Sequence, residues 1–128
     1  MSDLQNYGKI SSIEGTGIGA GNFLALTSSD NHTIKKITSM SVCNSNANDS
    51  SFSLWQIDNT EWASTWQNGT IAEPTSVRKD RIFFKSELPK EMTYLGDVEI
   101  IIDNLKYLIF EAPVGVSITI WGITEGNN

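Results

Sequence analysis

Cysteine and histidine each occur once in the 128-residue chain. A single cysteine excludes an internal disulfide, and one residue of each type is too few for a cysteine- or histidine-rich metal site. No apolar run approaches the roughly 18 residues of a membrane-spanning helix. The first residues, MSDLQNYGK, also lack the charged and then apolar layout of a signal peptide. We therefore expect a protein of the reducing cytoplasm, or one that is assembled there into a larger particle.

Basic residues are scarce: nine lysines and arginines stand against 15 acidic residues, for a formal net charge of -6. Proteins that bind nucleic acid present a basic face that displaces counterions from the phosphates. Docking on an anionic membrane also needs clustered basic residues. The sequence thus predicts neither nucleic acid nor a membrane among the partners.

Residues that favour strands and turns are abundant. The chain has 15 Ile, 15 Ser, 11 Thr and 11 Asn, and only 19% of its residues are charged. β-branched residues favour a pleated, half-buried surface, whereas Ser and Asn favour turns. Period-2 alternation, typical of strands, is found at 33–44, 51–57, 79–86, 105–112 and 115–123, with weaker strand candidates at 9–14, 21–27 and 91–95. The run VEIII (98–102) indicates a further strand that is buried on both sides at its end.

Short turn segments separate most of these runs, as in sandwiches and small barrels. We predict an all-β fold, a single antiparallel β-sandwich or jelly-roll-like domain of about seven to nine strands, with a long connection at 58–81. The glycines of GTGIGAG (15–21) give the chain conformational freedom. We therefore expect residues 1–22 to form a glycine-rich N-terminal arm that orders against a neighbouring subunit, and residues 23–128 to form the sandwich.

The alternation also predicts which side chains fill the core. Within 33–44, it places Ile37 on the same face as Ser39, Ser41 and Cys43, and it places Thr38, Met40, Val42 and Asn44 on the other face. We expect Cys43, which lies mid-strand among apolar neighbours, to act as a small core residue. The predicted buried set consists of Val42, Leu54, Leu108, Phe110, Ile118 and Ile120.

The connection 58–81 shows no period-2 alternation and is longer than the other links between the predicted strands. Its segment EWASTWQ can form one helical turn with Asn59 or Thr60 as the N-cap. Trp62 and Trp66 are four residues apart and would then share one face of that turn. Two roles stay open for these tryptophans: they cover an open end of the sandwich, or they are exposed contacts for a protein partner or a sugar.

No constellation of residues points to catalysis. His32 lies in a polar turn beside Ser29 and Asp30, which is more typical of a solvated turn than of a catalytic triad. Asp97 and Glu99 are two residues apart on one strand, and such a pair without a cleft belongs to a solvated face. We expect no enzyme activity and assign no catalytic residue.

Two weak ligand patterns also occur. Gly15, Gly17 and Ala20 match the loose form of a dinucleotide fingerprint, but no helical pattern follows them. Three asparagines alternate along 44–48 as calcium ligands do, but the glycine and the glutamate that complete a calcium loop are missing. We predict neither a cofactor nor a metal.

Two segments resemble small virion structural proteins of tailed bacteriophages, of β-sandwich type. In 36–57, a strand ends in Cys-Asn, a polar turn follows, and the next strand alternates. In 97–126, a strand, an Asp-Asn turn and a further strand lead to an alternating strand that closes on Gly122. The first likeness is carried by Ile37, Met40, Val42, Cys43, Asn44, Phe52, Leu54 and Ile57.

This resemblance implies a non-enzymatic virion protein that is assembled in the host cytoplasm. It implies a small repeated subunit, such as a capsid decoration protein or a head–tail or tail accessory protein, which forms a homo-oligomer and contacts capsid or tail subunits. Because aromatic residues are common interface anchors and the glycine-rich arm is expected to order against a neighbour, the candidate interface residues are Trp62 and Trp66 in the connection and Tyr7 and Ile18 in the arm. The alternative is a carbohydrate-binding or host-adhesin module, in which Trp62, Trp66 and Tyr94 stack on sugar rings.

Overall fold

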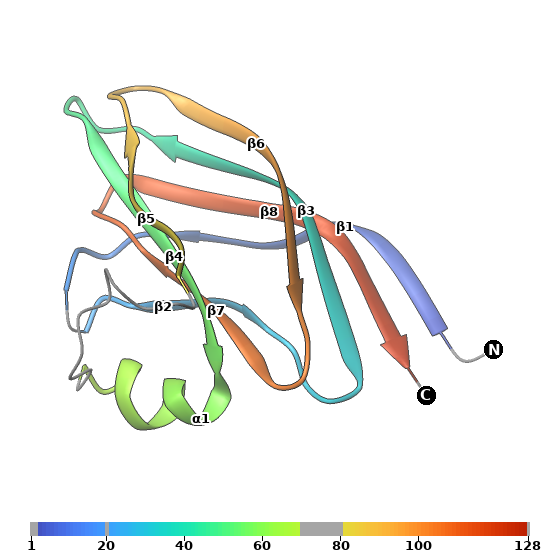
Figure 1. Ribbon diagram of the computed structural model, residues 1–128. Coiled ribbons are helices and arrows are strands. Elements are labelled where there is room, and N and C mark those ends of the chain that lie inside the picture. Colours follow the sequence, from blue (N-terminus) through green and yellow to red (C-terminus); the bar gives the residue numbers. More distant parts are fainter. Residues whose placement is uncertain (1–2, 20, 70–80, 128) are drawn as a thin grey trace.

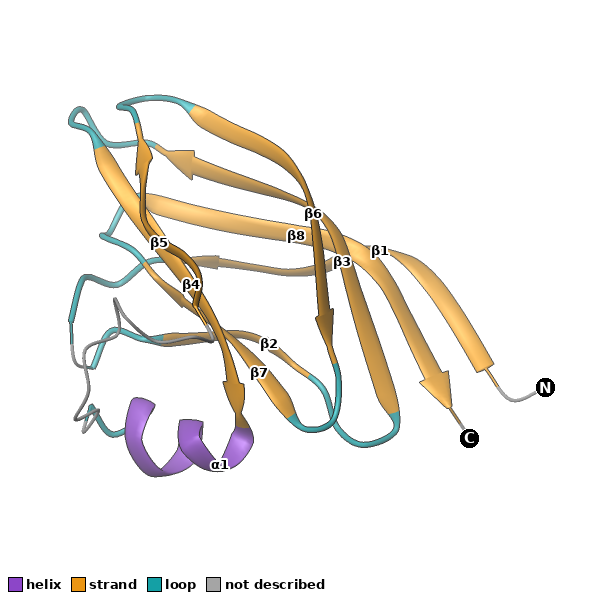
Figure 2. Ribbon diagram, viewed as in Figure 1, coloured by secondary structure: helices purple, strands orange, loops and turns teal. Residues whose placement is uncertain are grey.

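A computed structural model of the chain describes residues 3–19, 21–69 and 81–127 (Figures 1 and 2). The described part is built mainly of strands, as predicted. The strands are β1 (Asp3–Glu14), β2 (Leu24–Ser28), β3 (Thr33–Asn44), β4 (Ser50–Asp58), β5 (Arg81–Leu88), β6 (Thr93–Ile102), β7 (Lys106–Glu111) and β8 (Val116–Asn127). The helical part consists of α1 (Asn59–Glu61) and a π-helical turn, η1 (Trp62–Trp66). The remainder of the 58–81 connection lies outside the described residues.

The strands form two four-stranded sheets, with the orders β1-β8-β3-β6 and β2-β7-β4-β5. All their pairings are antiparallel. Along the chain, every connection except that between β4 and β5 crosses from one sheet to the other. Eight strands arranged in this way form a jelly roll. The prediction of an antiparallel, jelly-roll-like sandwich is confirmed.

Strand β1 corrects the expected boundary between an arm and the sandwich. Residues 3–14 pair with β8, from Asp3 opposite Asn127 to Glu14 opposite Ser117. The glycine-rich loop that follows is also tied to the sandwich, because the Gly17 amide donates to the Ala112 carbonyl at 3.0 Å. The described part of 1–22 is therefore an edge strand and its connection, and the prediction of a separate arm is wrong there. A β-bulge between Lys9 and Ser11 interrupts the alternation of β1, of which the sequence indicated only the weaker candidate 9–14.

The core lies between the two sheets and contains all six side chains that the sequence assigned to it. Val42, Leu54, Leu108, Phe110, Ile118 and Ile120 are each 0% exposed. Ile37 joins them although the alternation placed it on the opposite face. A β-bulge between Ile37 and Ser39 reverses the parity of β3 at that point, so Ile37 points inward. Cys43 is half-buried on the outer side of β3, which corrects its assignment to the core.

The turn between β3 and β4 is organised by Asn44, which is fully buried. Its side-chain amide donates to the carbonyl oxygens of Asn48 and Leu88, both at 3.0 Å, while its Oδ1 accepts from the Asn46 amide at 2.9 Å. A buried polar group needs such partners, because its desolvation is otherwise uncompensated. The alternating asparagines of 44–48 thus include a residue that holds a turn together.

A second apolar cluster lies on the outer face of the sheet β2-β7-β4-β5. It consists of buried Trp55, Ile57, Trp66 and Ile109, with Phe23, Trp62 and Tyr107 packed against them. The segment α1–η1 brings its tryptophans onto this face directly after β4, and Figure 2 shows the helical turns at that end of the sheet. Asp58, rather than Asn59 or Thr60, occupies the N-cap position. The tryptophans therefore cover a sheet face and not an open end of the sandwich.

Candidate functional site

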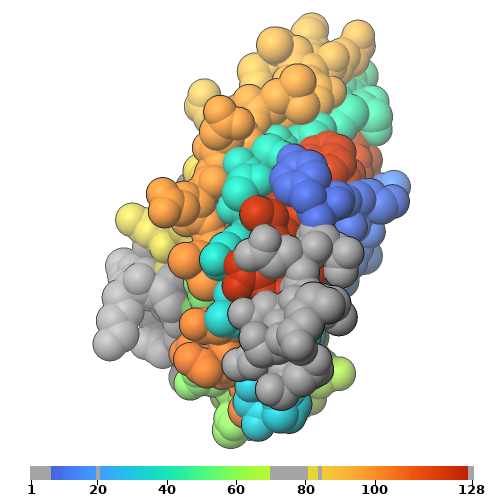
Figure 3. Space-filling model, turned by 90° about the vertical axis from the view of Figure 1, so that its right-hand side faces the viewer, coloured from blue at the N-terminus to red at the C-terminus, as the bar shows by residue number. Residues whose placement is uncertain are grey.

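The outer face of the sheet β1-β8-β3-β6 is not covered by any other described element, in contrast to the outer face of the second sheet. Its side chains alternate with the core residues along each strand. Figure 3 views the molecule from the side where β1 (blue), β8 (red), β3 (teal) and β6 (orange) reach the surface next to one another. This open face is the candidate site.

One row of side chains crosses the open face through all four strands. Lys9 of β1 lies opposite Trp121 of β8, Trp121 lies opposite Ser39 of β3, and Ser39 lies opposite Asp97 of β6. We call these four residues the central row. A shallow cavity of about 240 Å³ opens there, lined by Ser39, Met40, Leu95, Gly96, Asp97 and Trp121. The row therefore combines an ammonium, an indole, a hydroxyl and a carboxylate around one hollow.

The rows on either side differ in character. On one side, a second row consists of Tyr7, Ile123, Lys36 and Ile101, and it is mainly apolar. Lys36 in it pairs with Glu125 at 2.7 Å. On the other side, a third row consists of Ser12, Thr119, Ser41 and Leu95. The Ser12 and Thr119 hydroxyls are hydrogen-bonded at 3.0 Å. The open face thus mixes hydroxyls with a few large apolar groups.

Strand β6 forms one edge of this sheet and carries exposed apolar side chains. Leu95 is 74% exposed, Tyr94 is 41% exposed, and Met92 in the preceding turn is 55% exposed. Among the described strands, β6 pairs with β3 alone. An edge strand of this kind presents unpaired backbone N–H and C=O groups beside apolar side chains.

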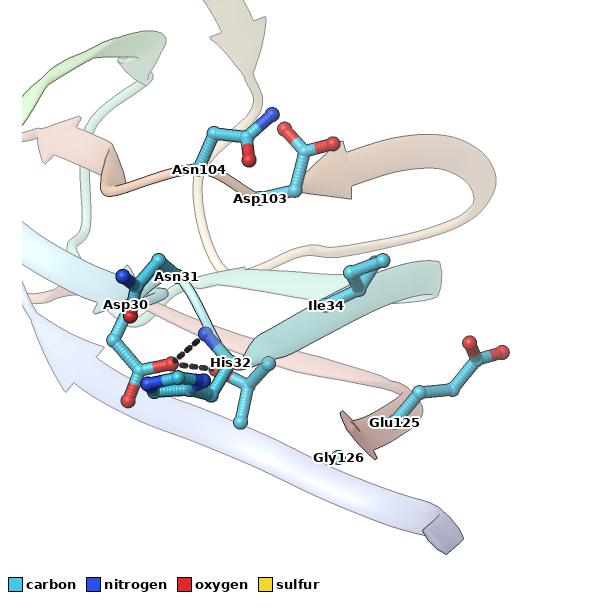
Figure 4. Close-up of a pocket in the computed structure, with 9 residues that line it drawn as sticks. Asp30, Asn31, His32, Ile34, Asp103, Asn104, Glu125 and Gly126 are labelled. Carbon is cyan, nitrogen blue, oxygen red and sulfur yellow. Dashed lines mark hydrogen bonds between the residues drawn. The ribbon is translucent and has the colours of Figure 1, made fainter. Parts of the chain in front are cut away.

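A polar cavity of about 370 Å³ lies at one end of the sandwich (Figure 4). Asp30 and His32 line it on one side, and Asp103 and Asn104 face them from the loop between β6 and β7. The Asp30 carboxylate accepts hydrogen bonds from the His32 amide at 2.8 Å and the Thr33 hydroxyl at 3.0 Å. These bonds lower the pKa of Asp30. The Asp30 carboxylate therefore stabilises the turn 30–33. Among the described residues, no group of three or more His, Cys, Asp or Glu side chains is placed to bind a metal.

Glu111 is a buried carboxylate on the covered face of the other sheet, and it is 5% exposed. Its Oε2 accepts a hydrogen bond from the Gly19 amide at 2.7 Å. Burial is the main cause that raises the pKa of Glu111, while this hydrogen bond and the charge of Lys85 act in the opposite direction. The contact fixes the loop after β1 against β7.

The raised pKa of Glu111 predicts a pH-dependent stability. The pKa of Glu111 is higher in the folded state than in the unfolded state, so the protonated carboxyl group stabilises the fold below the unfolded-state pKa. This contribution to the free energy of unfolding is lost as the pH rises through the folded-state pKa. Glu111→Gln keeps an acceptor for the Gly19 amide and removes the buried charge. As the pH rises from about 4 to about 7, the contribution that Glu111 makes to the free energy of unfolding should decrease in the wild type and be absent from the variant. Urea denaturation at both pH values measures this.

The matched control for Glu111 is Glu99→Gln, which changes an exposed carboxylate on β6. It should retain the wild-type difference between the two pH values. An unchanged pH dependence in Glu111→Gln would show that the Glu111 carboxylate carries no buried-charge penalty.

The structure does not bring the four sequence-predicted interface residues together. Tyr7 is 69% exposed in the first half of β1, and Ile18 is 52% exposed in the loop that follows the strand. Trp62 is half-buried and stacks on Tyr107, with ring centroids 5.9 Å apart. Trp66 is 0% exposed, so its assignment as an interface residue is wrong.

Sequence reasoning missed Trp121 as a candidate. Its outward position could be predicted, because the alternation along β8 places Trp121 on the face opposite to that of buried Ile118 and Ile120. What the sequence does not show is that Lys9, Ser39 and Asp97 come beside it, since these residues lie on three other strands.

Comparisons with known proteins give little further information. No protein-family model matches the chain, and no curated protein matches it. A solved structure of infectious bursal disease virus, Gx strain, is similar with a TM-score of 0.45 and 12% sequence identity. The match covers 97% of this chain and 32% of that one, so the chain spans about a third of the matched chain's length. Within the described residues, no helix is long and apolar enough to cross a membrane.

Proposed function

We propose that the chain is a non-enzymatic virion structural protein, a small repeated subunit that binds copies of itself and other virion proteins. Jelly rolls of eight strands are used in viral capsid domains and in lectins. Because a fold by itself does not define a function, this part of the proposal is an analogy of fold. It agrees with the resemblance of 36–57 and 97–126 to tailed-phage virion proteins, which further suggests a capsid decoration or head–tail or tail accessory subunit.

The exposed apolar side chains on the edge strand β6 are the main evidence for assembly. Met92, Tyr94 and Leu95 lie within four consecutive positions and are all exposed. Stable monomers usually protect edge strands with charges, prolines or bulges. In β6, the charges of Asp97 and Glu99 and the register shift between Asp97 and Ile100 lie after Leu95, in the second half of the strand. Large apolar side chains at an open edge instead favour contact with another chain, because their burial removes apolar surface from water.

A second copy of the chain is the occupant that fits this edge. Two β6 strands related by a two-fold axis can pair antiparallel, which continues each four-stranded sheet into its partner. The same surface patch then meets itself, and Leu95 of both copies leaves water. Contacts with other virion subunits can use the rest of the open face.

Leu95→Lys tests this assembly. A charged side chain at the edge should weaken self-association at least about tenfold, equivalent to about 1.4 kcal/mol. Light scattering coupled to size exclusion, over a range of protein concentrations, measures the mass. Val114→Lys is the matched control, because Val114 is 63% exposed in the turn before β8. It should leave the mass of the oligomer unchanged.

Mass spectrometry of purified particles from the encoding virus tests the virion assignment directly. We expect the chain in many copies per particle, with Leu95→Lys reducing its incorporation and Val114→Lys retaining it. A monomeric wild-type protein that is absent from purified particles would overturn the proposal.

A further inference from the structure

The central row has features of a ligand site that the proposed assembly through β6 does not require. We propose that it binds a neutral saccharide, with one pyranose ring packed on the indole of Trp121. The site differs from the one suggested by sequence, because Trp66 is buried and Trp62 stacks on Tyr107. Trp121, in contrast, lies on the open face.

The spacing of the strands gives the hollow its size. Neighbouring strands lie about 4.8 Å apart, so Trp121 and Asp97, two strands apart across β3, are separated by about 10 Å. The residue between them is Ser39, whose side chain is small. The cavity of about 240 Å³ therefore opens between larger neighbours. It is smaller than the roughly 300–1,000 Å³ of pockets that enclose drug-sized ligands, which suits a single ring.

Trp121 is well placed to act as a stacking platform. It lies on β8, which is flanked by β1 and β3 and is therefore not at an edge of the sheet. Its side chain is half-buried. A ring held in this way needs little additional ordering when a ligand packs on it. The apolar C–H face of a pyranose matches the face of an indole, and aromatic side chains gain from such large, flat contacts.

The polar members of the row match the hydroxyl rim of a sugar. The Asp97 carboxylate accepts hydrogen bonds, the Lys9 ammonium donates them, and the Ser39 hydroxyl does both. These groups flank Trp121 on both sides along the row. The formal net charge of -6 and the carboxylates of Asp97 and Glu99 disfavour an acidic sugar, because like charges repel. The chemistry therefore favours a neutral saccharide.

Saturation-transfer NMR of the full chain tests the site with a fixed set of probes: maltotriose, lactose, mannotriose and N,N′-diacetylchitobiose. We expect transfer to at least one probe. Trp121→Ala should weaken its binding at least tenfold, Trp121→Phe should retain part of it, and Asp97→Asn should weaken it less than Trp121→Ala. Trp62→Ala is the control, because Trp62 lies in η1 and packs on the opposite sheet, and this variant should bind the probe as the wild type does.

Near-UV circular dichroism verifies that each variant is folded, and Trp121→Phe keeps the test valid if Trp121→Ala does not fold. Light scattering on the same samples separates saccharide binding from self-association. We expect folded Trp121 variants to keep the wild-type mass. The absence of transfer to all four probes, or a loss of the oligomer in the Trp121 variants without any saccharide binding, would overturn the proposal and assign the row to a protein interface.

Discussion

Replacing Phe110 with alanine should lower the free energy of unfolding by about 3–5 kcal/mol, the range measured when a buried Phe is truncated in a core. Phe110 is 0% exposed and belongs to the main core cluster between the sheets. Its strand, β7, is internal to its sheet, and Phe110 lies opposite Leu24 of β2 and Leu54 of β4. The cavity left by the ring is bounded by three strands, which limits how far the surroundings can relax.

Urea denaturation followed by far-UV circular dichroism measures this loss. A domain of this kind is stable by about 5–15 kcal/mol, so the variant should unfold at a clearly lower urea concentration or fail to fold. Phe110→Leu keeps most of the buried volume and should cost less. Tyr7→Ala, at an exposed site on β1, should stay within about 0.5 kcal/mol of the wild type. A Phe110→Ala protein as stable as Tyr7→Ala would contradict the described core.

Trp66→Ala should have an effect of similar size, about 3–5 kcal/mol, although Trp66 lies outside the main core. Its ring is 0% exposed and packs edge-on against Phe23 and Trp55, with centroids 4.9 and 5.2 Å apart. Aromatic pairs in this geometry contribute beyond the area that they bury. The indole N–H also donates to the Glu61 carboxylate at 2.5 Å, and truncation removes this hydrogen bond.

Trp62→Ala is the matched control for Trp66→Ala, because both residues belong to the same π-helical turn. Trp62 is half-buried and should therefore cost less than Trp66 when truncated. Chemical denaturation measures both losses, and near-UV circular dichroism reports the aromatic cluster. Equal losses for the two variants would indicate that they share one environment, which the structure contradicts.

The strands that the sequence located most securely are those with uninterrupted alternation. The run 33–44 coincides with β3, and the run 51–57 lies within β4. The core residues followed from the same pattern, since period 2 defines a buried face wherever the strand is regular. A bulge breaks this rule. It moved Ile37 to the core side, because one extra residue shifts every preceding side chain to the other face.

The candidate site was far less accessible to sequence reasoning. The outward position of Trp121 follows from alternation, but its neighbours in the central row come from strands that are distant in the chain. The glycines of 15–21 suggested an arm because no local signal shows that β1 pairs with β8. Pairing between the two ends of a chain depends on the packing of all the strands between them.

The sequence by itself determined the class of fold, the positions of most strands and the six core residues, because these depend on local alternation and turn propensity. The tertiary structure alone decided which strands became neighbours, which tryptophan was buried, and which sheet face stayed open. Trp62 and Trp66 share a turn and both pack on the cluster of Trp55 and Ile109, yet only Trp66 is fully buried in it. The physical reason is that burial depends on the surfaces that packing brings together, and their partners lie far apart in the sequence.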